Sequence, residues 1–429
     1  MEVVGRDSLW RDRSFQLFWA GESISIAGTQ ITLVVLPILT FQLTGSASRT
    51  SVLLSIQAAP YLVFGLLAGA IADRTNRRAL MIGANLLSAA AMASIPIAAA
   101  LGVLTLAQIY IVGLVTATAF VWHDSASFGA LPAIVGRDRV VPAFSAFVST
   151  ETALRVGATA VAGVLAATLG AATALWADAA SYLVAALALA LIPRAFGTPL
   201  PRQADGPRLV RRLARDVGEG LRFLRRHALV WPLTITGFGL SLTGGAVLGL
   251  TVVYGVRQLG LPGDDARLGW LFSSGAVGAL LAAVALPRLV RRVSQPRLSL
   301  LAFVGNLVLT GGIALASSLP ASLLLLFAWN ATYTLIIVNG IALRQQLTPD
   351  RLQGRVNVTA RMIAWGGQPF GAALGGLLAD HTSIRITLLV MTLGVATSTA
   401  YGWLSPLRDA NASTVASFAA EAEASTRPT

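Results

Sequence analysis

The chain has 429 residues, of which 55% are hydrophobic and only 12% are charged, about half the charged share of a soluble globular protein. The formal net charge is +13 and there is no cysteine, which excludes disulfides, thiolate metal sites and a cysteine nucleophile. The charges stand in short clusters between long apolar runs, so the chain lacks the charged exterior that water requires and the lipid bilayer is its expected partner.

The positive charge does not indicate a nucleic-acid partner. All 32 basic residues are arginine, and they gather in the links between apolar runs rather than along one face of a domain. Their placement is therefore evidence on membrane topology.

The apolar runs predict twelve membrane-spanning helices, because roughly 20 apolar residues cross a hydrocarbon core of about 30 Å. The first run is too long for a signal-peptide core and has no small-residue cleavage site after it, so we expect a retained helix. The predicted spans are Ser14 to Phe41, Thr50 to Ala72, Ala79 to Leu101, Leu104 to Ser127, Val140 to Thr168, Ala172 to Pro193, Ala228 to Gly255, Leu268 to Leu286, Leu298 to Ser317, Ala321 to Gln345, Val356 to Ala379 and Ile384 to Leu404.

The arginines test this count independently. When the links are assigned to alternating sides, about 26 arginines fall on the side of the N-terminus and about four on the other. This bias predicts that both termini lie in the cytoplasm.

The longest link divides the spans into two sets of six. We expect an N-terminal bundle over residues 1–193, a cytoplasmic linker over 194–227, a C-terminal bundle over 228–404 and a disordered tail over 405–429. The later part of the linker, LVRRLARDVGEGLRFLRR, has leucines at helical spacing opposite arginines, which is typical of an amphipathic helix at a membrane surface.

An internal repeat supports the two halves. The segment GLLAGAIADRTNRRAL aligns without gaps on GALLAAVALPRLVRRVS, so that Arg74, Arg77 and Arg78 fall on Arg288, Arg291 and Arg292. Two parallel six-helix halves are typical of secondary transporters that bind substrate near the bilayer midplane.

The first copy of this segment resembles the loop motif of the major facilitator superfamily. The motif has a glycine, three residues, an aspartate and an arginine, then two residues and two arginines, and here it comprises Gly69, Asp73, Arg74, Arg77 and Arg78. The resemblance implies the twelve-helix fold and a charge clamp that holds one conformation and breaks in another. In the second half Pro287 replaces the aspartate.

Nearly the whole chain is similar to the efflux branch of that superfamily, which contains bacterial macrolide exporters and the enterobactin exporter. The resemblance is carried by FQLFWAGESISIAGTQITLVVLPI, ALPAIVGRDRVVPAFSAF, WADAASYL and RLQGRVNVTARMIAWGGQPFGAALGGLLAD. It implies proton-coupled efflux of a hydrophobic or amphipathic small molecule, such as a drug, a macrolide, a siderophore or a secondary metabolite, by a monomer in the bacterial inner membrane. An uptake or lipid-related transporter and a non-transporting receptor are the alternatives.

Charged residues inside the spans need a physical reason, because a charge near the bilayer centre costs about 2.5 to 3.5 kcal/mol even on the lenient scale. Glu151 lies roughly 16 Å into the fifth span by helix rise, and Arg155 follows one turn later. The spacing of four places them on one helix face. They are either a static ion pair or a cavity-lining pair in which Glu151 exchanges a proton.

Other residues of the spans are candidates for the same cavity. Glu22 and Gln30 lie two turns apart in the first span and are predicted to line the substrate and proton pathway. Structural or cavity roles are predicted for Asp124, Asp178, Arg361, Trp329 and Tyr333.

An enzyme is not expected. The chain has no GxxxxGK[ST] phosphate loop, and its three histidines, His123, His227 and His381, form no HExxH pair for a metal. No catalytic residue, metal or cofactor is predicted.

Overall fold

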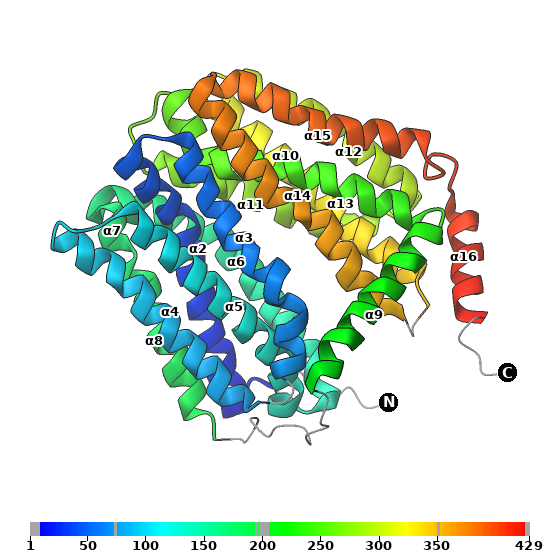
Figure 1. Ribbon diagram of the computed structural model, residues 1–429, viewed down its shortest axis with the longest axis horizontal. Coiled ribbons are helices and arrows are strands. Elements are labelled where there is room, and N and C mark those ends of the chain that lie inside the picture. Colours follow the sequence, from blue (N-terminus) through cyan, green and yellow to red (C-terminus); the bar gives the residue numbers. More distant parts are fainter. Residues whose placement is uncertain (1–8, 73–74, 194–195, 197–205, 350–351, 425–429) are drawn as a thin grey trace. The chain divides into compact units, whose positions relative to one another are not determined.

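The computed structural model describes residues 9–72, 75–193, 196, 206–349 and 352–424, and within these ranges the regular structure is helical throughout (Figure 1). Each predicted span coincides with a helix or, for the sixth span, with a pair of helices. The twelve spans correspond to α2 (Arg13–Thr44), α3 (Ala47–Ala72), α4 (Arg77–Ala100), α5 (Leu106–Val135), α6 (Val140–Leu169), α7 with α8 (Ala171–Ala174, Trp176–Leu191), α10 (Val230–Arg257), α11 (Arg267–Leu289), α12 (Gln295–Leu315), α13 (Leu319–Gln346), α14 (Gln353–His381) and α15 (Ile384–Leu404).

Within the described residues, ten of these segments are long and apolar enough to cross a membrane by length and composition. The other two predicted spans coincide with α3 and α14, which have 26 and 29 residues. The prediction of an all-helical polytopic membrane protein is confirmed.

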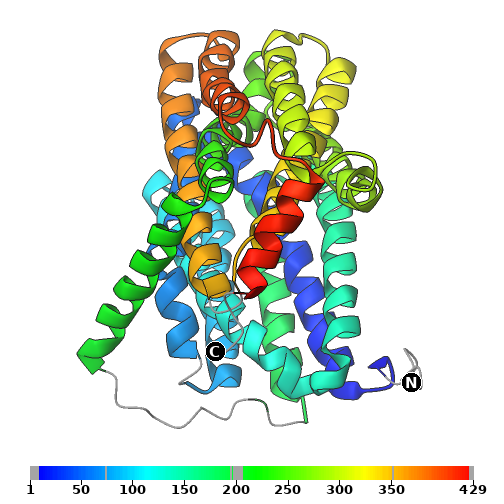
Figure 2. The same ribbon diagram turned by 90° about the vertical axis from the view of Figure 1, so that its right-hand side faces the viewer.

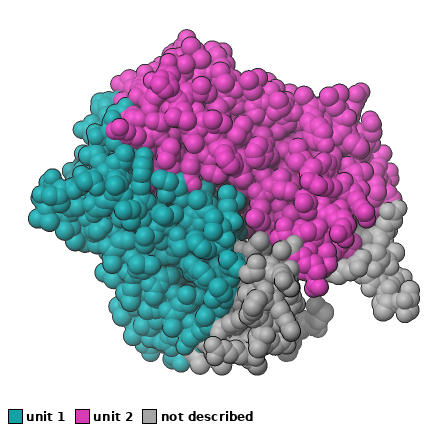
Figure 3. Space-filling view, viewed as in Figure 1, with its two compact units in different colours: residues 1–45, 56–203, 261–273 teal, residues 46–55, 204–260, 274–429 magenta. Residues whose placement is uncertain are grey.

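Two compact units make up the chain (Figure 3). Unit 1 contains Met1–Gly45, Ile56–Gln203 and Leu261–Ser273, and unit 2 contains Ser46–Ser55, Ala204–Gly260 and Ser274–Thr429. The short segments 46–55 and 261–273 are therefore grouped differently from the predicted bundles over 1–193 and 228–404, and the division at the linker stays a prediction.

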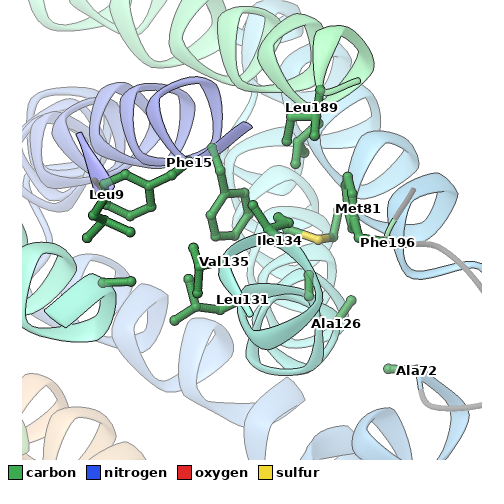
Figure 4. Packing of buried hydrophobic residues seen from close by; sticks show 14 residues of the cluster. Leu9, Phe15, Ala72, Met81, Ala126, Leu131, Ile134, Val135, Leu189 and Phe196 are labelled. Atoms are coloured by element: carbon green, nitrogen blue, oxygen red, sulfur yellow. The ribbon is translucent and has the colours of Figure 1, made fainter. Parts of the chain in front are cut away.

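Unit 1 is held together at one end by a cluster of aromatic and aliphatic side chains (Figure 4). Phe15 and Phe18 of α2 are almost fully buried, and they pack with Met81 of α4 and Ile134 of α5. Close van der Waals packing of such side chains holds neighbouring helices together in a bilayer, where lipid tails are as apolar as the side chains. Asp12 begins α2 by accepting a hydrogen bond from the Ser14 N–H at 3.0 Å, as an N-cap does.

In unit 2, α10 and α14 pack closely through the glycines of the predicted eleventh span. A Cβ atom at Gly367 or Gly371 would overlap backbone carbonyl oxygens of Phe238 or Leu242 in α10. Glycine is therefore required where the two helix backbones approach each other.

The predicted amphipathic linker helix is α9 (Gly206–Arg226). Its later part packs against α14, where Arg355 lies 3.1 Å from Asp216 and also pairs with Glu219 (Figure 1). Leu224 is fully buried in a cluster with Val230 and Val356. This end of the helix therefore covers protein, whereas the sequence suggested a membrane surface.

The C-terminal tail differs from the predicted disorder, because Ala412–Ala424 forms helix α16 (Figure 2). Asn411 begins the helix by accepting a hydrogen bond from the Thr414 N–H at 2.9 Å. Val415 is buried, and the Phe418 ring lies 5.0 Å from the His227 ring. Local capping and these apolar contacts explain why an alanine-rich segment is ordered here.

Candidate functional site

A cavity of about 180 Å³ lies within unit 1 and contains four of the predicted site residues. It is bounded by side chains of five helices, α2, α4, α5, α6 and α8. Its charged and amide-bearing residues are Glu22, Gln30, Asn85, His123, Glu151 and Arg155. The helices thus gather polar groups from distant parts of the sequence around one space.

Glu22 and His123 form the more enclosed pair in this cavity. Glu22 Oε1 lies 3.3 Å from His123 Nε2, and the side chains are only 14% and 12% exposed. Both atoms are buried, and neither has another hydrogen-bond partner in the described part of the chain. A carboxylate and an imidazole at this distance can share or exchange one proton.

Glu151 and Arg155 form the more open pair. Arg155 Nη2 donates to Glu151 Oε1 at 2.9 Å within α6, and the side chains are 53% and 46% exposed. The contact predicted from their spacing is therefore present. Because both side chains also line the cavity, they are accessible to a substrate that enters it.

Uncharged polar groups complete the lining. Gln30 and Asn85 are buried, and the Asn85 amide nitrogen has no hydrogen-bond partner among the described residues. Thr29 Oγ1 and the Tyr182 hydroxyl lie 3.3 Å apart. A buried amide without a protein partner is usually satisfied by water or by a ligand.

Asp178 does not line the cavity but is fully buried one helical turn before Tyr182. Its carboxylate accepts hydrogen bonds from Thr32 of α2 and Ser181 of α8. Gly28 makes room for this arrangement, since a Cβ there would overlap Ser181 and Asp178. These contacts join α2 to α8. Of the two roles predicted for Asp178, structural or cavity-lining, they favour the structural one.

The loop motif is only partly covered by the structure. Asp73 and Arg74 lie outside the described residues, and Gly69 lies near the end of α3. Arg77 Nη1 donates to the Gly129 carbonyl at 3.1 Å, and Arg78 donates to the Ala190 carbonyl. The two later arginines thus tie the start of α4 to α5 and α8, while the predicted charge clamp stays a prediction.

The remaining candidates lie apart from the cavity. Trp329 is fully buried, donates to Thr310 Oγ1 at 2.9 Å and stacks on Tyr333 with ring centroids 5.1 Å apart. The Arg361 guanidinium lies 4.5 Å from the Trp365 ring centroid, and Asp124 is exposed. Trp329 and Tyr333 therefore pack inside unit 2.

Sequence reasoning missed His123 as the partner of Glu22, because the contact joins residues of α2 and α5 that are far apart in the chain. The available signal was a histidine inside an apolar span. Within the described residues, no group of three His, Asp or Glu side chains is arranged to hold a metal ion.

Comparisons with known proteins agree with this architecture. The transmembrane secretion effector family matches residues 8–425. The multidrug efflux pump Tap of Mycolicibacterium fortuitum is 27% identical over 376 residues, which cover 86% of this chain and 89% of the pump. The enterobactin exporter EntS of Citrobacter koseri is 26% identical over 376 residues, which cover 86% of each chain.

The fold is also found among solved structures. A bacterial homologue of the human lysosomal transporter Spinster superposes with a TM-score of 0.71 at 12% sequence identity, covering 96% of this chain and 98% of that chain. Because the family match spans nearly the whole sequence, this chain belongs to the transmembrane secretion effector family of major facilitator superfamily transporters.

Proposed function

We propose that this protein exports a hydrophobic or amphipathic small molecule by alternating access, in exchange for protons. The observation that carries the proposal is the cavity of unit 1, where two carboxylates, one histidine and one arginine surround about 180 Å³. Similarity to the efflux pump Tap and the exporter EntS supports the outward direction. Drugs, macrolides, siderophores and secondary metabolites are the substrate classes that fit this proposal.

The chemistry of the exchange follows from the two pairs. In the substrate-free state, a proton taken up from outside is held between Glu22 and His123, which lie 3.3 Å apart and are shielded from solvent. Substrate entering the cavity competes for the polar groups around it and displaces that proton toward the cytoplasm. The more open Glu151–Arg155 pair contacts the substrate and changes its ion pairing as the substrate binds.

Alternating access requires two bundles that rock about a central site. We assign residues 1–193 and 228–404 to these bundles, with 194–227 as the linker and both termini in the cytoplasm. The arginine bias supports this orientation. A monomer in the bacterial inner membrane is sufficient for the cycle, and no cofactor or enzymatic step is needed.

The experiment uses everted membrane vesicles that contain the full-length protein, with erythromycin and ethidium as probes. An interior-acid pH gradient should drive uptake of at least one probe, and an ionophore that collapses the gradient should abolish it. Vesicles without the protein are the control. Uptake that is unaffected when the gradient is collapsed would rule out proton exchange.

A further inference from the structure

Two adjoining cavities in unit 2 share a pair of polar side chains. One has a volume of about 210 Å³ and is lined by residues at the end of α13 and the start of α14, and the other has a volume of about 40 Å³ and is lined by residues of α10, α12, α13 and α14. Arg344 and Asn357 line both of them. A single water needs roughly 10 to 15 Å³, so the smaller cavity has room for about three water-sized groups and the larger one for a polyatomic ion.

Arg344 is the unusual residue of these cavities. It stands in the last turn of α13, is only 7% exposed, and has a buried Nε atom without a hydrogen-bond partner in the described part of the chain. Arginine stays charged in proteins, so it cannot avoid the cost of burial by losing a proton. The negative end of the α13 dipole offsets part of this cost but gives Nε no acceptor.

A second cation faces the smaller cavity. Arg361 lines it together with Arg344, and its guanidinium is held against the ring of Trp365 at 4.5 Å. Among the described residues, no aspartate or glutamate lines either cavity.

We infer that Arg344, Arg361 and Asn357 form a binding site for an oxyanion of the phosphate class in unit 2. A guanidinium fork matches the geometry of phosphate oxygens, and Asn357, which lines both cavities, supplies an amide donor. Bound phosphate would satisfy the Arg344 Nε atom and reduce the repulsion between the two cations. This site is distinct from the cavity of unit 1 and does not depend on the proposed proton exchange.

The anion has two chemical sources, which an experiment separates. The full-length protein is placed in phosphatidylcholine nanodiscs, and its thermal unfolding midpoint is measured against inorganic phosphate at constant ionic strength. In a second arm, phosphate is omitted and the fraction of phosphatidylglycerol in the nanodisc is increased. A saturating rise of the midpoint in the first arm indicates a free anion, and a rise in the second indicates a lipid headgroup.

The variants decide whether this site is responsible. Arg344→Gln and Arg361→Gln should each weaken the apparent affinity by about tenfold or more, because each removes charge-assisted hydrogen bonds. Arg297→Gln removes an exposed arginine of α12 and should behave as the wild type. If Arg344→Gln does not fold, Arg344→Lys keeps the charge without the fork and should still weaken binding.

The proposal is overturned if neither arm raises the unfolding midpoint of the wild type. It is also overturned if Arg361→Gln and the folded Arg344 variant keep the wild-type affinity. Loss of stability in the Arg344 and Arg361 variants without any loss of anion dependence would assign these arginines to structure alone.

Discussion

At the scale of single residues, substitution of Glu151 and Arg155 distinguishes an ion pair that only stabilises the helix from one that takes part in transport. Partly exposed pairs four residues apart in a helix contribute only about 0.3 to 0.5 kcal/mol, and these side chains are about half exposed. Glu151→Gln and Arg155→Gln should therefore leave the unfolding midpoint nearly unchanged while lowering transport of the probe that the wild type accumulates by about tenfold. If both variants transport as well as the wild type, the pair has no role in transport and is only a static ion pair.

Gly28 provides a test of the buried contact between α2 and α8. Gly28→Ala places a methyl group against Ser181 and Asp178, and overpacking of this kind costs about 1 to 3 kcal/mol. Gly83→Ala in α4 is the matched control, because a Cβ there meets no atom within 4 Å and alanine favours the helix by up to about 1 kcal/mol. Thermal unfolding in detergent should show a lower midpoint for the first variant only.

The residues that sequence could predict are those whose contacts are local. The Glu151–Arg155 contact follows from a spacing of four in one helix. The Glu22–His123 contact and the unsatisfied Arg344 atom depend on how separate helices pack. Side-chain spacing along one helix contains no information on either.

At the scale of elements, α9 is attached to α14 by apolar packing around Leu224 and by the ion pairs of one arginine. Arg355 pairs with both Asp216 and Glu219 of α9, and a partly exposed network of this kind is worth about 1 kcal/mol. Arg355→Gln should speed hydrogen exchange of amides 215–226 roughly fivefold. Arg222→Gln, an exposed arginine on α9 itself, should leave exchange unchanged, and equal exchange in both variants would contradict the attachment.

Asp380 connects the end of α14 to the start of α3 inside unit 2. Its carboxylate accepts hydrogen bonds from the Ala47 N–H at 2.8 Å and the Ser48 N–H at 3.0 Å, and Arg257 lies 3.3 Å away. Burial alone would raise the pKa of Asp380, but hydrogen bonds from Ser46, Ser48 and Ala47 more than compensate and hold the pKa below its usual range. Asp380 lies just beyond the predicted end of the span at Ala379.

This lowered pKa gives a pH dependence with a definite sign. The stabilising contribution is present above the ordinary aspartate pKa of about 3.9 and is lost as the pH falls further toward the folded-state value. Asp380→Ala should lower stability by about 1 kcal/mol at pH 7, as loss of a helix cap does. The difference from the wild type should narrow below about pH 4, and a difference that is constant down to pH 3 would contradict this account.

The sequence predicted which segments form membrane-spanning helices better than it predicted where the helices end and what they pack against. Apolar length is sufficient to find the spans, since the bilayer sets it. The helix α16 was not predicted, because it is buried against His227 and Val230, which are far from the tail in the sequence. The contact of α9 with α14 was missed for the same reason, because an amphipathic face fits lipid and protein equally well.

At the scale of the whole molecule, the internal repeat and the arginine bias predict a transporter fold without any information on how the helices pack. The repeat relates Arg74 to Arg288, 214 residues later, and the family match over residues 8–425 supports the transporter fold that the repeat predicted. The substrate could not be predicted, because the shape of a cavity depends on which helix faces meet.

Glu22 is the residue on which the proposed exchange most directly depends, so its replacement is the decisive measurement. The probe is whichever of erythromycin and ethidium the wild type transports. Its accumulation in everted vesicles with an interior-acid gradient is compared with counterflow in vesicles that are preloaded with the same probe and have no gradient. Glu22→Gln should retain counterflow but lose at least about 90% of the accumulation, because a neutral amide cannot hold the proton shared with His123. Accumulation by Glu22→Gln equal to that of the wild type would contradict the proposed proton site.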